Sequence, residues 1–143
     1  MHTSPAPAYR TLDQIEQLVR AFETCTVTPA EFTHHAHITV ALWYLVHAPA
    51  EEATERMRAG LHRLLAHYGL HGYNETITLF WMKLLRHFLD VAGSNRSPVE
   101  LSNEAIARFG SMRYVFHHFS KPLVFSDAAR HGWVEPDLVP LAF

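Results

Sequence analysis

The sequence has little of what defines several common protein classes. Its 143 residues include a single cysteine, Cys25, which excludes an internal disulfide and a cysteine-rich zinc module. Only 18% of the residues are charged and the formal net charge is −2, whereas nucleic-acid and anionic-membrane partners require clustered lysine and arginine. No apolar run is long enough to span a bilayer, and residues 1–10 lack the apolar stretch of a signal peptide. We therefore expect a soluble, cytoplasmic protein without a nucleic-acid or membrane partner.

The residues that are present predict one all-α domain. Forty-eight percent of them are hydrophobic, which is enough to form a core in a chain of this length. Apolar residues recur at helical spacing, and strand patterns are nearly absent. We expect an up-and-down four-helix bundle core with one or two short extra helices and an extended C-terminal tail packed on the bundle. The domain is expected over 11–143, preceded by a flexible arm over 1–10.

Capping residues and helix breakers divide the helical pattern. Thr28, Pro29 and Glu31 resemble an N-cap, a first-turn proline and an acidic third residue, so they predict the start of the second helix. Asn74 is a suitable N-cap for the fourth helix, which is apolar on most faces and is therefore expected to be central. In chain order, the expected helices cover approximately 12–24, 28–47, 50–68, 74–92, 98–109, 112–119 and 126–131.

Two of the 12 histidines, His34 and His37, fall on or beside the apolar face of the second expected helix. They are three residues apart and therefore share a face. A buried imidazole needs a hydrogen-bond partner or a metal ion, because an unpaired polar group is costly to bury. The positive end of the helix dipole disfavours protonation there and keeps a nitrogen lone pair available. The pair is therefore a candidate for metal ligation, for general-base chemistry or for a hydrogen-bonded network without metal.

A second polar group, Tyr73 to Thr78, surrounds the start of the fourth helix. In an up-and-down bundle the second and fourth helices run in the same direction, so their N-termini lie at one end. His34, His37 and Glu75 can converge there, and two histidines with a carboxylate form a ligand set of zinc and non-haem iron enzymes. A glutamate in a first turn can equally complement the helix dipole. The candidate metal ligands are His34, His37 and Glu75, the candidate catalytic residues are Glu75, Tyr73 and Thr78, and the candidate substrate-pocket residues are His71, Trp81 and Tyr44.

Other chemical motifs are weak or missing. His117 and His118 are adjacent, so at most one of them can face a site on a helix. The sequence has no H-E-x-x-H motif, no pair of E-x-x-H motifs, no glycine-rich phosphate loop and no G-x-S-x-G motif. Zincin, di-iron, nucleotide-binding and serine-hydrolase functions therefore have no support.

Three segments resemble the motifs of an uncharacterised family of small bacterial all-helical proteins: F-x-H-x-x-H, then Y-H-E-T-x-T, then a closing W-V-x-P-D-L-x-P-L. The matching segments begin at Phe32, Tyr73 and Trp133. The resemblance implies that the important residues are His34, His37, Glu75, Thr76 and Thr78. It does not imply a particular reaction. Asn74 replaces the family histidine of the second motif, so a metal ligand would be lost there if that histidine is one. The closing motif implies that Arg130 and Asp137 either cap the site or act as a charged clamp that folds the tail onto the bundle.

The sequence supports three functional hypotheses. The first is a small metal-dependent enzyme that acts on a small organic substrate at one end of the bundle, with zinc or iron held by the two histidines and Glu75. The second is a non-catalytic small-ligand-binding or accessory protein that uses the same histidines as a polar network. The third is a structural interaction module that forms a homodimer.

Overall fold

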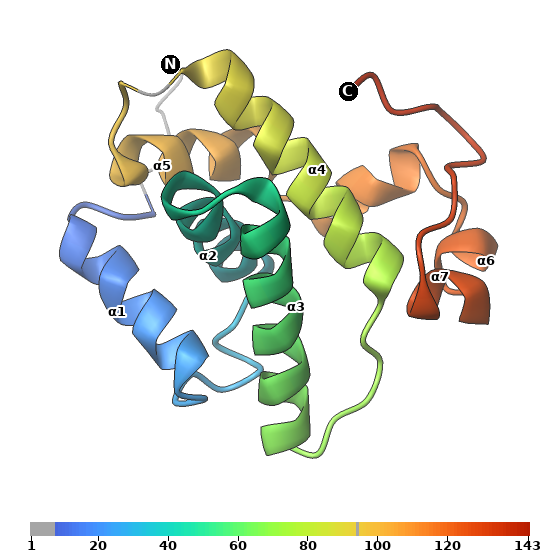
Figure 1. The fold of residues 1–143 in the computed structure, drawn as a ribbon, viewed down its shortest axis with the longest axis horizontal. Helices are drawn as coiled ribbons and strands as arrows, with labels where there is room; N and C mark the ends of the chain where they lie inside the picture. Colours follow the sequence, from blue (N-terminus) through green and yellow to red (C-terminus); the bar gives the residue numbers. More distant parts are fainter. Residues whose placement is uncertain (1–7, 94) are drawn as a thin grey trace, which may run out of the picture.

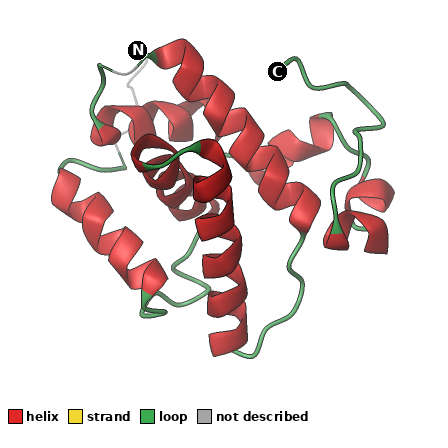
Figure 2. Cartoon of the chain, viewed as in Figure 1, coloured by secondary structure: helices red, strands yellow, loops and turns green. Residues whose placement is uncertain are grey.

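Every regular element in the described part of the chain is a helix (Figures 1 and 2). The structure is a computed structural model, and it describes residues 8–93 and 95–143. None of the helices in these two ranges is both long and apolar enough to cross a bilayer. The predicted all-α fold is confirmed. The elements are α1 (Leu12–Glu23), α2 (His34–His47), α3 (Ala50–His67), α4 (Glu75–Ala92), α5 (Pro98–Phe109), the 3₁₀ helix η1 (Met112–His117), α6 (Lys121–Val124) and α7 (Asp127–His131).

Helix α2 lies at the centre of the packing. It contacts α1, α3, α4 and α5, and Figure 1 shows it nearly end-on among them. Its middle is buried around its circumference, which explains why its apolar residues do not keep to one narrow stripe. Helix α4, which the sequence predicted to be central, packs against α2, α3, α5 and α7.

The start of α2 lies later than the sequence predicted. Thr28 and Glu31 do form reciprocal hydrogen bonds: the Glu31 carboxylate accepts from the Thr28 N–H at 2.9 Å, and the Thr28 hydroxyl accepts from the Glu31 N–H at 3.2 Å. However, these reciprocal hydrogen bonds close only a single turn. The chain then extends at Thr33, whose hydroxyl accepts from the Ala36 N–H at 3.3 Å and caps the helix. His34 is therefore the first residue of α2.

The start of α4 agrees with the prediction, and Asn74 has a structural role there. Its side-chain oxygen accepts from the Ile77 N–H at 3.0 Å, and its side-chain nitrogen donates to the Val124 carbonyl at 2.7 Å. The second bond ties α4 to α6, a short helix that sequence analysis missed. Asn74 thus joins two elements that are 50 residues apart in the chain.

The C-terminal tail packs along the helices, as predicted. The Leu138 N–H donates to the His118 carbonyl at 3.0 Å, and the His118 Nδ1 lies 2.8 Å from the Val139 carbonyl. The Asp137 carboxylate accepts from the Ser120 N–H at 2.8 Å and from its hydroxyl at 2.6 Å. Asp137 therefore fastens the tail to Ser120 by itself, whereas the resemblance implied a clamp of Arg130 and Asp137. His118 serves the tail and does not line the cavity described below.

The arm predicted over 1–10 falls mostly outside the described residues, because the description begins at residue 8. Its last part is bound to the domain. The Tyr9 N–H donates to the Asn103 side-chain oxygen at 3.0 Å, and the Asn103 side-chain nitrogen donates to the Tyr9 carbonyl at 2.8 Å. At Tyr9 the chain is therefore already attached to the domain.

A row of aromatic rings connects the contact between α1 and α3 to the start of α2. A Cβ atom at Gly60 would lie 2.3 Å from a ring carbon of Phe22, so only glycine fits there with Phe22 in its present position. Phe22 stacks on Phe32, with ring centroids 4.8 Å apart, and Phe32 meets His37 edge-on at 6.0 Å. The position of His37 thus depends on close packing between two other helices.

Candidate functional site

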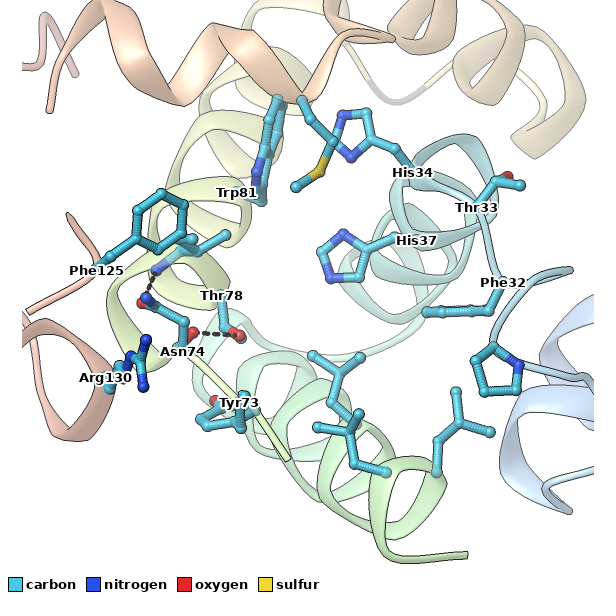
Figure 3. A pocket seen from close by; sticks show the side chains of 17 residues that line it. Phe32, Thr33, His34, His37, Tyr73, Asn74, Thr78, Trp81, Phe125 and Arg130 are labelled. Atoms are coloured by element: carbon cyan, nitrogen blue, oxygen red, sulfur yellow. Dashed lines mark hydrogen bonds between the residues drawn. The ribbon is translucent and has the colours of Figure 1, made fainter. Parts of the chain in front are cut away.

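The first turns of α2 and α4 open on one cavity of about 510 Å³ (Figure 3). The residues that cap these helices, Thr33 and Asn74, both line it. The sequence predicted that these two N-termini lie together, and the structure places them so. Most of the remaining wall is apolar and comes from α3, α4, η1 and the turn between α6 and α7: Leu61, Leu64, Leu65, Ile77, Met112 and Phe125.

The structure brings some of the predicted site residues together and separates others. His71 lines a neighbouring hollow instead of this cavity. Tyr44 is buried elsewhere, where its hydroxyl donates to the Glu23 carboxylate at 2.9 Å, and burial raises its pKa. Glu75 is also absent from the cavity wall. The predicted residues that do line the cavity are His34, His37, Tyr73, Thr78 and Trp81.

Glu75 is part of an ion pair. The Arg58 guanidinium donates to its carboxylate at 2.6 Å, and the Tyr73 hydroxyl donates to the same carboxylate at 2.5 Å. The hydrogen bonds from Arg58 lower the pKa of Glu75, so its carboxylate is charged at neutral pH. Glu75 therefore connects α3 to the start of α4 and has a positioning role for Tyr73.

The predicted metal site is consequently not assembled. In the ranges that the structure describes, no group of three or more histidine, cysteine, aspartate or glutamate side chains is placed to hold a metal ion. The pair His34 and His37 remains, but catalytic zinc sites supply three protein ligands. The residues around the cavity thus do not fit the zinc or iron ion that the sequence suggested, because Glu75 is held by Arg58.

Replacing Glu75 by glutamine should lower the free energy of unfolding by about 1–3 kcal/mol, because Arg58 would lose its partly buried partner and keep only its pair with the exposed Glu55. The side chains of Arg58 and Glu75 are only 28% and 15% exposed. Urea denaturation at pH 7 measures the change. The matched control is Glu52→Gln, whose pair with Arg56 is exposed and should contribute less than about 1 kcal/mol. Equal losses in the two variants would contradict this account of Glu75.

His34 has a defined tautomer. Its Nε2 lies 3.1 Å from the Phe109 carbonyl oxygen, and since a carbonyl only accepts, Nε2 carries the proton and Nδ1 the lone pair. This Nδ1 is buried and has no hydrogen-bond partner within the described residues. The ring meets the edge of Trp81, with centroids 4.5 Å apart. Burial lowers the pKa of His34, so the ring is neutral at pH 7.

His37 lies beside His34 at the cavity wall. Their ring centroids are 6.3 Å apart and their planes are inclined by 24°. Burial, together with a smaller contribution from the neighbouring His34, lowers the pKa of His37 to about 4. Both imidazoles are therefore neutral at physiological pH, and the main cause is burial.

Trp81 adds a second polar atom without a partner. Its side chain is fully buried on α4, and its indole nitrogen has no hydrogen-bond partner among the residues that the structure describes. An indole N–H only donates, whereas the Nδ1 of His34 only accepts in its present tautomer. The wall of the cavity thus contains one unused donor and one unused acceptor on adjacent rings.

Sequence reasoning missed the residues that the last third of the chain contributes to the cavity. Met112 and Phe125 line it, and both are about half exposed (49% and 46%). Arg130 lines it from α7, although sequence analysis had considered it only through the resemblance. No local pattern marks these residues, because they reach the cavity through contacts between distant segments, such as that of α7 with α4.

No known family model, curated protein or solved structure matches the chain. The resemblance to small bacterial helical proteins therefore stays a prediction. What the cavity can do has to be argued from its own residues.

Proposed function

We propose that the chain is a small-molecule-binding protein that takes a largely apolar organic ligand into the cavity between α2, α3 and α4. The volume of about 510 Å³ lies in the ordinary range for ligand sites. The observation that carries the proposal is the pair of buried atoms without partners, the His34 Nδ1 and the Trp81 Nε1. A buried polar atom without a partner costs about 1–3 kcal/mol, and a ligand group that bonds to it removes this cost.

Recognition by neutral rings is favoured over catalysis by metal or base. The described residues at the cavity wall do not supply enough ligands for a metal ion. A general base works best with a pKa near the operating pH, whereas the pKa of His37 is about 4. His37 is therefore suited to accept a hydrogen bond from a ligand hydroxyl or amide and is a weak proton acceptor in a reaction.

Nuclear magnetic resonance of the indole N–H groups tests the proposal, because the three tryptophans lie in different surroundings. Trp81 lines the cavity, whereas Trp43 and Trp133 do not. Titration with millimolar 3-phenylpropanamide, a neutral probe, should shift the indole signal of Trp81 and the ring-nitrogen signals of His34. The indole signals of Trp43 and Trp133 should stay in place. No shift at Trp81, or equal shifts at all three tryptophans, would contradict binding in the cavity.

A substitution that removes one donor sharpens the test. Trp81→Phe deletes the indole N–H while it keeps an aromatic ring in the wall. We expect it to weaken binding of 3-phenylpropanamide about 5–10-fold, which corresponds to one hydrogen bond of about 1–1.5 kcal/mol. Isothermal titration calorimetry measures the affinity. The matched control, Trp43→Phe, should bind the probe as the natural protein does, and equal weakening by both variants would contradict a role for the Trp81 N–H.

A further inference from the structure

We infer that the ligand of this cavity is an organic monocarboxylate with an apolar body, and that Arg130 binds its carboxylate. This inference rests on the proposed function and deepens it by naming the class of ligand. Its basis is the distribution of charge around the cavity, which is independent of the two unpartnered atoms that carry the proposed function.

Arg130 is the one residue with a formal charge among those that line the cavity in the described structure. No aspartate or glutamate lines it, and its two histidines are neutral at pH 7. A ligand cation would therefore lose its hydration without gaining an opposite charge. The chemistry of the wall excludes cationic ligands and leaves neutral and anionic ones.

The helix dipoles act in the same direction as Arg130. Both α2 and α4 begin at the cavity, since their caps Thr33 and Asn74 line it. The N-terminus of a helix carries a partial positive charge of about half a unit. These two termini and the guanidinium face the same space. The first turn of α2 holds no acidic residue, and Glu75 in the first turn of α4 is paired with Arg58, so the cavity favours a negative charge.

Arg130 is free to bind a ligand. Within the part of the chain that the structure describes, its guanidinium forms no salt bridge. Asp127, three residues earlier on α7, lines the neighbouring hollow together with Arg130 but does not pair with it. Of the two carboxylates that follow Arg130 in the sequence, Glu135 accepts from the Trp133 indole N–H and Asp137 accepts from Ser120. A guanidinium binds a carboxylate through two parallel N–H donors, which is the strongest use of an unpaired arginine.

The arrangement also indicates how such a ligand would lie. Figure 3 shows Arg130 on the side formed by α4 and α7, across the cavity from His37 on α2. Apolar side chains, among them Leu64 and Ile77, line the space along with Phe125. A molecule with its carboxylate at Arg130 would therefore place its apolar body in the middle and its far end near the histidines.

A carboxylate fits this site better than a phosphate. Phosphate sites at helix N-termini use free backbone N–H groups. Here the caps are already filled, because the Asn74 side chain accepts from the Ile77 N–H and the Thr33 hydroxyl accepts from the Ala36 N–H. The one charged donor at the cavity is the Arg130 guanidinium, and one bidentate pair matches the two oxygens of a carboxylate.

Three probes with the same phenylpropyl body test the inference: 3-phenylpropionate, 3-phenylpropanamide and 3-phenylpropylammonium. We expect the carboxylate to bind about fivefold more tightly than the amide and the ammonium about fivefold more weakly. Both factors are modest because Arg130 is exposed to water. Isothermal titration calorimetry on the full chain measures the three affinities. Raising the NaCl concentration from 50 to 500 mM should weaken only the carboxylate toward the affinity of the amide.

Arg130→Gln should reduce the affinity for 3-phenylpropionate to that for 3-phenylpropanamide and leave the amide unchanged. The matched control is Arg20→Gln, an exposed arginine on α1 that lies outside the cavity wall, which should change neither affinity. If the amide binds and shifts Trp81 but the carboxylate binds no more tightly, the inference is overturned while the proposed function stands. A carboxylate preference that survives Arg130→Gln overturns the assignment to Arg130. If none of the three probes shifts Trp81, the proposed function and the inference both fail.

Discussion

Replacing Trp81 by alanine should lower the free energy of unfolding by about 3–5 kcal/mol, which is the usual range for removing a large buried aromatic ring. Trp81 is fully buried, and its ring packs against His34 at 4.5 Å, Phe80 at 5.3 Å and Tyr114 at 6.2 Å between centroids. Its removal would enlarge the neighbouring cavity. The rings around Trp81 belong to different helices, so they cannot easily move together to fill the space. For a domain with a total stability of about 5–15 kcal/mol, the loss is a large fraction.

Urea denaturation at pH 7 and 25 °C measures this loss. The matched control is Trp43→Ala on α2, since Trp43 is only partly buried and its ring rests on His47 at 4.0 Å. We expect the control to lose less than about 2 kcal/mol, because part of its ring already contacts water. If Trp81→Ala lowers the free energy of unfolding no more than Trp43→Ala does, the packing around Trp81 contributes no more to stability than that of the partly buried Trp43.

Stability should fall between pH 6.5 and pH 4 through the titration of His37. The pKa of its ring is about 4 in the folded chain, whereas an unfolded histidine titrates near 6.5. Below pH 6.5 the unfolded chain therefore binds a proton that the folded chain does not, and the folded state loses stability as the pH falls. The full contribution of His37 is present above pH 6.5 and is lost by pH 4. Without screening by water, the pKa shift of His37 would cost the folded state roughly 2.7 kcal/mol at pH 4.5. Because the ring contacts a cavity that admits water, we expect a loss of about 2 kcal/mol.

The experiment compares unfolding free energies at pH 7 and pH 4.5 for the natural chain and for His37→Leu. The difference between the two pH values should be smaller by about 2 kcal/mol in the variant, because leucine does not titrate. Other groups, including Glu75, contribute equally to both chains and cancel. Leu61→Ala is the control for packing, since it alters the same cavity wall and should shift stability by the same amount at both pH values. An identical pH dependence for His37→Leu and the natural chain would show that His37 titrates normally.

Local signals predicted most helix starts correctly, because caps depend on residues close together in the chain. Asn74 caps α4 as predicted, and α5 begins at residue 98 as expected, with Ser97 as its cap. The start of α2 was predicted too early for the same physical reason. The reciprocal hydrogen bonds of Thr28 and Glu31 form within a single turn. This residue pattern therefore cannot distinguish an isolated turn from the start of a helix.

The candidate site was predictable in position but not in composition. His34 and His37 lie at the cavity because the starts of α2 and α4 meet, which followed from helix order. The environment of Glu75 did not follow, because its partner Arg58 lies 17 residues earlier on another helix and no spacing rule connects them. Only the resemblance pointed to Arg130, since it reaches the cavity through the packing of α7 on α4.

The position of α7 has a consequence for synthesis on the ribosome. Thr76 at the start of α4 donates to the Gly132 carbonyl at 2.7 Å, and this bond holds the segment that carries Arg130 and Phe125. Helices α2, α3 and α4 emerge from the exit tunnel well before this segment does. The nascent chain must therefore keep the side of α4 that α7 covers exposed until α7 arrives, and the cavity wall is complete only then. During that interval the growing chain is open to chaperones and to premature association with its neighbours.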